Sequence, residues 1–411
     1  MNLLYPTTYA FCITFFLIFS RGTMSSSFGS EITNPSSGFA FDLYQHVIKG
    51  KEQQNVVLSP LSIYTALGLA YMGAGGRTKE EMASVLRIST NATESKESFR
   101  RLLCKYKASS MLSIANKVYV QSGKNLQPSF VEASEKVFSS EADVINFSQS
   151  DVAAKTINSW VESKTNNKIQ NLIDPSNLDS NTMMVLVNAI YFKGFWKNQF
   201  RKELTKKADF WTSETESVKV DMMSNNKAHY PYGVFEDLDA AAVELPFRDE
   251  DLAMLIILPN SKTGLPSLEA KLRSMDLFKL RQRMHSEEVI VSMPKFKIEF
   301  SIELNDVLSE MGMSSMFSDN ADFSGLLNSA EPLKVSKVIH KAFIDVNEEG
   351  AEAAAATAGH VIRKRCIQFT REFIADHAFI IALIATSNED PSVAFLGCLK
   401  SYQPNKLHDE L

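Results

Sequence analysis

The chain is poor in cysteine, which argues against a fold held together by disulfides. Its 411 residues contain four cysteines. Cys12 lies in an N-terminal apolar run whose removal would leave an odd number, so no disulfide framework is expected, and the spacings match no zinc site. Cys398 lies in an apolar run and is expected to be buried as a small hydrophobe. Cys366 follows Lys364 and Arg365, whose charges favour its thiolate.

Motifs of catalysis are missing as well. There is no Gly-x-Ser-x-Gly elbow, no His-Glu-x-x-His motif and no phosphate-binding loop, and the seven histidines indicate no catalytic cluster. An enzyme, a metal site and a cofactor are therefore not expected. The net charge of -5 and an isoelectric point near 5.9 argue against nucleic acid as a partner.

Long apolar runs are also absent, apart from a short one at residues 10–19. That run is too short to span a bilayer and suits the core of a secretory signal peptide, although no positive charge precedes it. We expect residues 1–23 to be a signal peptide, cut somewhere between Ser20 and Ser30. A buried core helix is the alternative. No later run is long enough to cross a membrane, so no membrane insertion is expected.

The other end of the chain carries a matching address. Its last residues, His408, Asp409, Glu410 and Leu411, form a retrieval signal for the endoplasmic reticulum. We expect the tail at 402–411 to bind the KDEL/HDEL receptor, which would keep the protein in the endoplasmic reticulum lumen and early secretory pathway, with a fraction secreted. A plain charged tail is the alternative.

Two sequons, at Asn91 and Asn146, would permit N-glycosylation in that compartment.

Between these ends, the pattern mixes helix and strand, with no internal repeat. Strands are expected at residues 114–120, 183–192, 242–245, 252–258, 289–300, 333–346, 373–385 and 392–399. Helices are expected at residues 38–49, 151–165 and 302–312. Another helix should begin with Ser59 as its N-cap and Pro60 in its first turn, and Thr78 with Glu81 should form a capping box for the next one. The class is α+β, as one large domain.

The most informative segment, residues 347–359, combines small side chains with charge on one face only. Read with the two-residue period of a strand, one face carries Ala351, Ala353, Ala355, Thr357 and Gly359. The opposite face carries Glu352, Ala354, Ala356, Ala358 and His360. No bulky or charged group on the first face would stop this segment from sliding between two strands. An exposed alanine-rich helix is the alternative, since Ala is the best helix former.

Five separated blocks, in the correct order, resemble the serpin family over nearly the whole chain. They are residues 55–82, the Leu-Val-Asn-Ala-Ile-Tyr-Phe-Lys-Gly-Phe-Trp run at 186–196, Val-Ser-Met-Pro-Lys-Phe at 291–296, the segment 348–357, and 373–397. The resemblance implies a serpin domain at 33–401, with three β-sheets, eight or nine helices and an exposed reactive-centre loop at 346–370.

The resemblance also implies a mechanism. Inhibitory serpins are single-use baits: a serine protease attacks the loop, forms an acyl-enzyme, and is trapped covalently as the loop inserts into the main sheet. We therefore expect a monomeric suicide inhibitor of serine proteases of the secretory pathway. A non-inhibitory chaperone is the alternative, because the collagen-specific serpin chaperone also has a retrieval tail. An intact alanine-rich hinge is unnecessary for a chaperone.

By resemblance, individual residues take roles. The hinge corresponds to Glu349, Gly350, Ala351, Glu352, Ala353, Ala354, Ala355, Ala356 and Thr357. The family's shutter, a polar network beneath the central strands, corresponds to Ser59, Ser62, Asn188 and His340. The breach, where the loop first enters the sheet, corresponds to Trp196. Ala351 departs from the family pattern, which more often has Thr there, but the smaller side chain should not slow insertion.

The target is expected from Ile362, Arg363, Lys364 and Arg365, which would fill the protease subsites. The spacing of the resembled family, counted from Gly350, points to cleavage of Lys364–Arg365, whereas a loop one residue longer points to Arg365–Cys366. We favour the second bond, because subtilisin-like proprotein convertases cut after Lys-Arg pairs and share this compartment. Invertebrate serpins with a retrieval tail and a dibasic loop directed at such convertases are similar. A solvated charge cluster, or a site of incidental degradation, is the alternative.

Furin itself prefers arginine at the position of Ile362. Kexin-like and prohormone-convertase-like enzymes are therefore at least equal candidates, with trypsin-like proteases as the fallback.

Overall fold

The computed structural model describes residues 35–107, 109, 111–248, 251–272, 277–329, 331–350, 371–386 and 392–402. The chain divides into residues 1–31 and 32–411, and only the second unit is described below. The expected signal peptide, the loop residues from Ala351 to Cys366 and the retrieval signal fall outside the described residues.

The main sheet has five strands. Their order is β11 (Phe296–Glu303), β12 (Lys337–Val346), β4 (Met184–Phe192), β2 (Leu112–Gln121) and β3 (Glu141–Ile145). β12 runs parallel to β4, and β2 runs parallel to β3, whereas the other neighbours are antiparallel. All of β4 is buried, as expected for a strand with layers on both faces.

Ten further strands follow a second pairing path. Its order is β1 (Val56–Leu58), β15 (Val393–Leu399), β14 (Phe379–Ala385), β9 (Leu252–Pro259), β8 (Ala240–Pro246), β7 (Ala228–Phe235), β10 (His285–Pro294), β6 (Ser217–Ser224) and β5 (Lys206–Trp211), with β13 (Arg371–Ile374) beside β10. β10 pairs with β7 through residues 285–289 and with β6 through residues 292–294. The path is therefore two sheets joined at β10, which gives three sheets in all.

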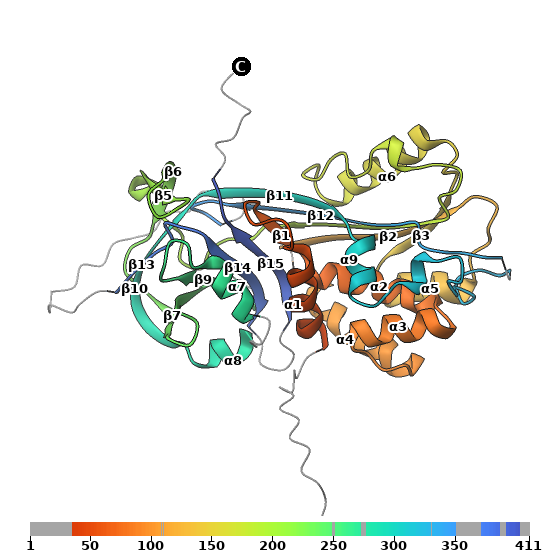
Figure 1. Ribbon diagram of the computed structural model, residues 1–411, viewed down its shortest axis with the longest axis horizontal. Coiled ribbons are helices and arrows are strands. Elements are labelled where there is room, and N and C mark those ends of the chain that lie inside the picture. The colour runs from red at the N-terminus through yellow and green to blue at the C-terminus, as the bar shows by residue number, and fades with distance from the viewer. Residues whose placement is uncertain are drawn as a thin grey trace, which may run out of the picture. The chain divides into compact units, whose positions relative to one another are not determined.

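Nine α-helices lie within the described residues. They are α1 (Pro35–Val47), α2 (Pro60–Gly73), α3 (Gly76–Leu86), α4 (Ala92–Lys107), α5 (Pro128–Lys136), α6 (Ser150–Lys164), α7 (Leu265–Leu272), α8 (Leu277–Gln282) and α9 (Asn305–Glu310). α2 contacts β4, β2 and β15, and is almost completely buried between sheets. α6 covers the opposite face of the main sheet (Figure 1). No described helix is long and apolar enough to cross a membrane.

Successive side chains of β4 belong alternately to two apolar cores. Leu186 and Ile190 belong to the larger core, which includes α2. Val187 and Tyr191 belong to a second core, between the main sheet and α6. Successive side chains of a strand point to opposite faces, so a continuous apolar run serves both layers at once.

Three predicted boundaries are wrong. The run at 289–300 is two strands, because the chain breaks at Lys295, whose backbone N–H donates to Asp221 O (2.9 Å). The run at 373–385 is also two strands, separated where the His377 ring bonds the carbonyl of Pro259 (2.7 Å). The helix expected at 302–312 is only α9, since β11 continues to Glu303.

The predicted capping box is also wrong. α3 begins at Gly76 with Gly75 as its N-cap, so Thr78 and Glu81 lie inside the helix. Their side chains serve tertiary contacts instead: Thr78 Oγ1 accepts from Asp322 N (3.0 Å), and Glu81 accepts from the backbone of Ser315 (2.8 Å). Two helix-to-loop contacts have replaced a local motif.

Candidate functional site at the seam of the main sheet

The boundary between β4 and β12, called the seam below, is where the predicted shutter residues meet. The two strands are parallel, with Asn188 opposite His340 and Tyr191 opposite Phe343. Because side chains alternate, the first pair faces α2 and the second faces α6. Any strand inserted here must break both sets of contacts.

The start of α2 supplies the polar groups beneath the seam. Ser59 is the N-cap of α2, as predicted, and accepts a hydrogen bond from Ser62 N (3.1 Å). Its hydroxyl also donates to the carbonyl of Ala394 (2.6 Å), which ties the helix to β15. Ser62 Oγ donates to Asn188 Oδ1 (3.0 Å). One helix cap therefore links two sheets.

His340 completes this network as a neutral ring. The backbone N–H of Ser59 donates to His340 Nε2 (3.3 Å), so Nε2 is the acceptor and the proton lies on Nδ1. Nδ1 in turn bonds Asn188 Oδ1 across the seam. Complete burial lowers the pKa of His340 to about 3. The structure thus brings Ser59, Ser62, Asn188 and His340 together.

Two members of the network were not predicted. Asn188 Nδ2 donates to Asn116 Oδ1 on β2, and Asn116 Nδ2 donates to Thr65 Oγ1 on α2 (2.8 Å). The available signal was a polar residue inside the apolar strand run at 114–120. A buried amide needs hydrogen-bond partners, so a polar residue inside that strand indicates a buried polar network.

At the end of the seam where β4 and β12 both terminate, Trp196 contacts the segment that follows β12. Its indole Nε1 donates to the carbonyl of Asn347 (2.9 Å), and its backbone N–H donates to the carbonyl of Glu349 (3.1 Å). The indole is stacked on Phe247, with ring centroids 4.5 Å apart. This tryptophan lies apart from the four shutter residues, at the end of the seam rather than beneath it.

Gly350 occupies a position that only glycine fits. Its φ is +128°, and it forms an antiparallel bridge with Phe195. A Cβ there would lie 2.0 Å from the carbonyl oxygen of Gly194. The backbone must therefore pass this point without a side chain, and it does so beside the exit from β4.

Two buried carboxylates precede that glycine. Glu348 pairs with Lys295 (3.1 Å) and accepts from Thr205 Oγ1 (2.8 Å). Burial opposes its ionisation, but these bonds and a backbone hydrogen bond lower the pKa of Glu348. Glu349 Oε1 pairs with Lys202 (2.5 Å), whereas Oε2 has no partner among the described residues. The hinge thus begins at two ion-paired glutamates, Glu348 and Glu349, which are called the hinge anchor below.

The family comparison identifies this arrangement. The model of the family Serpin (serine protease inhibitor) matches residues 34–401. The chain belongs to the serpin family. It is 36% identical to human Serpin B4, over 90% of this chain and all of that protein. It is 37% identical to antichymotrypsin-2 of Bombyx mori, over 87% of this chain and 96% of that protein.

A solved structure agrees. Cleaved Serpin 42Da superposes with a TM-score of 0.82 at 38% identity, covering 91% of this chain and 99% of its own. The expected α+β serpin fold with three sheets is therefore confirmed. The family is described as one of serine protease inhibitors, and the curated relatives of this chain include a leukocyte elastase inhibitor of Sus scrofa.

The predicted glycosylation sites of this serpin lie on its surface, whereas Cys398 lies in its core. Asn91 and Asn146 are both exposed, and Asn91 Oδ1 caps α4 by accepting from Thr93 N (2.9 Å). Cys398 is buried, which raises the pKa of its thiol to about 11, and Cys104 is exposed. Within the described residues, no group of His, Cys, Asp and Glu is suited to a metal ion.

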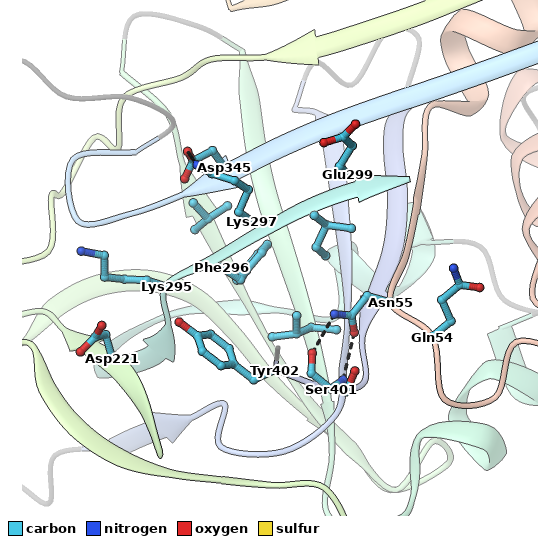
Figure 2. Close-up of a pocket in the computed structure, with 13 residues that line it drawn as sticks. Gln54, Asn55, Asp221, Lys295, Phe296, Lys297, Glu299, Asp345, Ser401 and Tyr402 are labelled. Atoms are coloured by element: carbon cyan, nitrogen blue, oxygen red, sulfur yellow. Dashed lines mark hydrogen bonds and ion pairs between the residues drawn. The ribbon is translucent and has the colours of Figure 1, made fainter. Parts of the chain in front are cut away.

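A pocket of about 850 Å³ lies beside β11, close to the hinge anchor (Figure 2). Its charged lining is largely self-paired: Lys297 bonds Asp345 (3.1 Å), and Lys295 bonds Glu348. Tyr402 and Ser401 close one side, where Ser401 N donates to Asn55 Oδ1 (2.9 Å). This pocket lacks convergent free groups for chemistry.

Proposed function

We propose that this serpin acts as a suicide substrate whose cleaved loop inserts into the seam between β4 and β12. The observation that carries the proposal is the place of Gly350, bridged to Phe195 where the chain leaves β12 beside β4. A chain turning back there would run antiparallel to both strands. One parallel pairing would become two antiparallel ones, which are slightly stronger per residue.

The sequence beyond Gly350 suits such a strand. Alternate residues from Ala351 to Gly359 are small and uncharged, and they would face the core under the seam. About fifteen inserted residues, each gaining about 0.5–1.5 kcal/mol of net hydrogen bonding, give on the order of 10 kcal/mol. That equals the stability of a typical domain. A shift of about 1 Å in the catalytic groups of a trapped protease costs roughly a hundredfold in rate, so the acyl bond would persist.

The proposed targets are subtilisin-like proprotein convertases, with cleavage after Arg365. Support comes from the Lys364–Arg365 pair inside a bait loop and from the secretory signals at both ends. The family relatives include an antichymotrypsin and a leukocyte elastase inhibitor, so the convertase target rests on the loop residues alone. Trypsin-like proteases, which also cut after basic residues, are the second candidate.

The proposed place of action is the endoplasmic reticulum and early secretory pathway. The retrieval tail from His408 to Leu411 would bind the KDEL/HDEL receptor, and the exposed Asn91 and Asn146 would be open to glycosylation. Deleting His408–Leu411 should move the protein into the medium, whereas a full-length protein already mostly outside the cell would contradict retention.

The test of the target is covalent capture. The purified protein is mixed with furin, a kexin-like convertase or trypsin, and complexes that survive denaturing gel electrophoresis are counted. Arg365→Ala should abolish complexes with the convertases, and Ile362→Arg should strengthen capture of furin. A charge-matched control is Arg371→Ala, at the start of β13 and outside the loop.

Mass spectrometry of the released C-terminal fragment assigns the bond. A fragment that starts at Cys366 supports cleavage after Arg365, and one that starts at Arg365 overturns it. No stable complex with any of the three proteases would contradict inhibition and favour the chaperone alternative.

A further inference from the structure

A buried lysine lies on the α6 side of the main sheet. Lys117 is in the middle of β2, and its side chain is only 5% exposed. It shares a strand face with Ala115 and Tyr119, which belong to the core under α6. Lysine is almost never buried unless its charge is paired, so its partners are the feature to explain.

The partners of Lys117 come from the next strand and from two aromatic rings. Lys117 Nζ lies 2.7 Å from Glu141 Oε2 and 2.6 Å from Asp143 Oδ2, both on β3. The same ammonium lies 5.1 Å from the ring centre of Tyr119 and 5.0 Å from that of Trp160. Two carboxylates and two π faces surround one cation.

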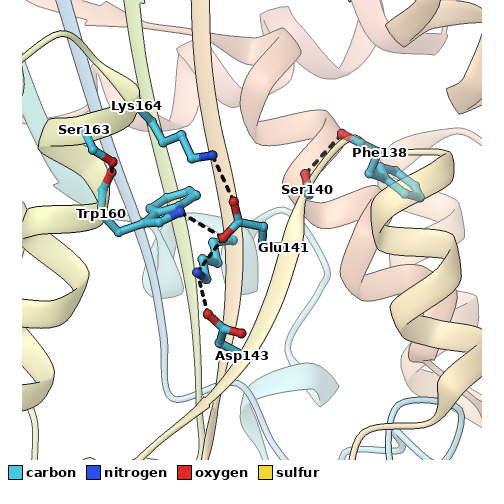
Figure 3. A network of polar contacts seen from close by, with 8 residues as sticks. Phe138, Ser140, Glu141, Asp143, Trp160, Ser163 and Lys164 are labelled. Carbon is cyan, nitrogen blue, oxygen red and sulfur yellow. Dashed lines mark hydrogen bonds and ion pairs between the residues drawn. The ribbon is translucent and has the colours of Figure 1, made fainter.

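The helix α6 joins this cluster through Glu141. The indole Nε1 of Trp160 donates to Glu141 Oε2 (3.1 Å), and Lys164 Nζ lies 2.9 Å from Glu141 Oε1 (Figure 3). Although burial opposes ionisation, hydrogen bonds from Lys117 and Lys164 lower the pKa of Glu141 to about 2. We call Lys117, Glu141, Asp143, Trp160 and Lys164 the joint.

The joint lies on one side of the seam only. β2 and β3 are on the β4 side. On the β12 side, the α6 layer makes apolar contacts through Ile339 and Phe343, and Lys341 Nζ donates to the carbonyl of Gln170, after α6 (2.8 Å). The α6 layer therefore straddles the seam, with an ionic cluster on one side and mostly apolar contacts on the other.

We propose that Lys117 is a positioning residue that fastens α6 to β2 and β3, and thereby sets the rate at which a strand enters the seam. The proposal rests on the loop-insertion function proposed above. An entering strand must separate β12 from β4 and pass beneath the α6 layer, which covers both strands.

The uneven contacts of α6 fix how the opening proceeds. Releasing the β12 side breaks apolar contacts and the Lys341–Gln170 hydrogen bond, while Lys341 keeps its ion pair with Glu299 (2.6 Å). Lifting α6 from β2 and β3 would leave Lys117 with its carboxylates on β3, but it would take the Trp160 ring away from the buried ammonium and the Trp160 and Lys164 donors away from Glu141. α6 therefore stays with β2 and β3, and it remains across the path of the strand. Without the Lys117 charge, α6 should rise more easily, and entry should become faster.

The test compares Lys117→Met with the wild type in spontaneous insertion, without added protease. Proteins are held at a fixed temperature below unfolding. Loss of trypsin inhibition and gain of heat resistance are followed over time. Lys117→Arg keeps the charge and should restore the wild-type rate. Leu268→Ala, in the buried face of α7, is the control for a loss of packing away from the main sheet.

Lys117→Met should convert about tenfold faster than the wild type, since the cation–π contact that it loses with Trp160 of α6 is worth about that factor when largely desolvated. Trp160→Phe, which removes the indole N–H and leaves a smaller aromatic ring near Lys117, should convert faster by a smaller factor and carries the test if Lys117→Met fails to fold. Rates within twofold of Leu268→Ala for both variants would overturn the proposal. Wild-type protein that neither inhibits trypsin nor gains heat resistance after loop cleavage would instead overturn the function proposed above.

Discussion

The seam and the joint hold the same sheet with opposite kinds of contact. The contacts across the seam are between neutral groups. His340 forms a hydrogen bond with Asn188 on one face, and the ring centroids of Tyr191 and Phe343 lie 5.8 Å apart on the other. At the joint, a buried ammonium meets carboxylates. Neutral pairs can part without leaving an uncompensated charge, whereas the buried ammonium of Lys117 cannot lose its carboxylates without leaving one.

This difference assigns motion to the seam and rigidity to the joint. A sheet that must accept a strand needs one boundary that opens and flanking layers that hold. The network under the seam is fully hydrogen-bonded while closed, so it favours the five-stranded state until a competing strand arrives.

The largest expected effect comes from placing a charge where the inserted strand would be buried. Ala355→Arg should lose nearly all covalent complex, because burying an unpaired guanidinium costs several kcal/mol and deacylation then wins. The matched control, Glu352→Arg, puts the same charge on the opposite face, at a position where the chain already has a charged side chain, and should retain complex formation. Equal complex yields for the two variants on a denaturing gel would contradict insertion into the seam.

A smaller effect is expected from the network itself. Asn188→Ala leaves the His340 Nδ1–H and the Ser62 hydroxyl without their acceptor, so the free energy of unfolding should fall by about 1–3 kcal/mol. Spontaneous loss of inhibitory activity should accelerate too.

Asn225→Ala is the control for that variant. It removes another buried amide, bonded to Tyr230 (2.6 Å) and to the N–H of Val291 (2.9 Å). Asn225 follows β6 and lies outside the five-stranded main sheet. It should lose similar stability by chemical denaturation without faster inactivation. Equally accelerated inactivation in both variants would mean that the network under the seam does not control strand entry more than any other buried polar group.

The seam and the joint should lose stability in different pH ranges as the pH is lowered. Unfolded His340 titrates near 6.5 and folded His340 near 3, so stability present above pH 6.5 is lost as the pH falls toward 3. For Glu141, the corresponding loss runs from about pH 4.5 down to about 2. Between pH 6.5 and 4.5, only the seam weakens, by at most about 1.4 kcal/mol per pH unit.

Unfolding free energies measured across pH 7 to 4 test this order. His340→Gln cannot titrate and should remove part of the slope between pH 6.5 and 4.5. A slope unchanged in that variant would show that other groups carry the acid sensitivity.

The smallest effect should come from the outer pair of the joint. Lys164 and Glu141 are each nearly half exposed, so Lys164→Met should cost at most about 1 kcal/mol of stability. Lys155→Met, at an exposed position of the same helix, controls for general charge loss. A cost above that of Lys117→Met in thermal unfolding would reverse the ranking inside the joint.

The sequence was sufficient for the features that depend on local pattern. The N-cap at Ser59, the buried strand β4 and the burial of Cys398 follow from capping chemistry and apolar runs. Strand breaks at Lys295 and near His377 were missed, because each is fixed by a backbone or ring contact to a distant strand rather than by a turn motif.

The joint was also missed, for a similar reason. Lys117, Glu141 and Trp160 are ordinary residues at unremarkable spacings, and only the parallel pairing of β2 with β3 under α6 brings them together. Tertiary contacts between distant segments carry little signal in a single sequence. Nothing in the local pattern distinguishes a buried lysine from a solvated one.

The most direct test of loop insertion is the unfolding temperature before and after the loop is cut. The loop of the wild type and of Ala355→Arg is cut by a protease that leaves no covalent complex on a denaturing gel, and both cleaved proteins are then heated while circular dichroism is recorded. An inserted strand adds on the order of 10 kcal/mol, so cleaved wild type should melt far above the intact protein, whereas cleaved Ala355→Arg should show little or no gain. A cleaved wild type that melts at or below the temperature of the intact protein would contradict insertion into the seam.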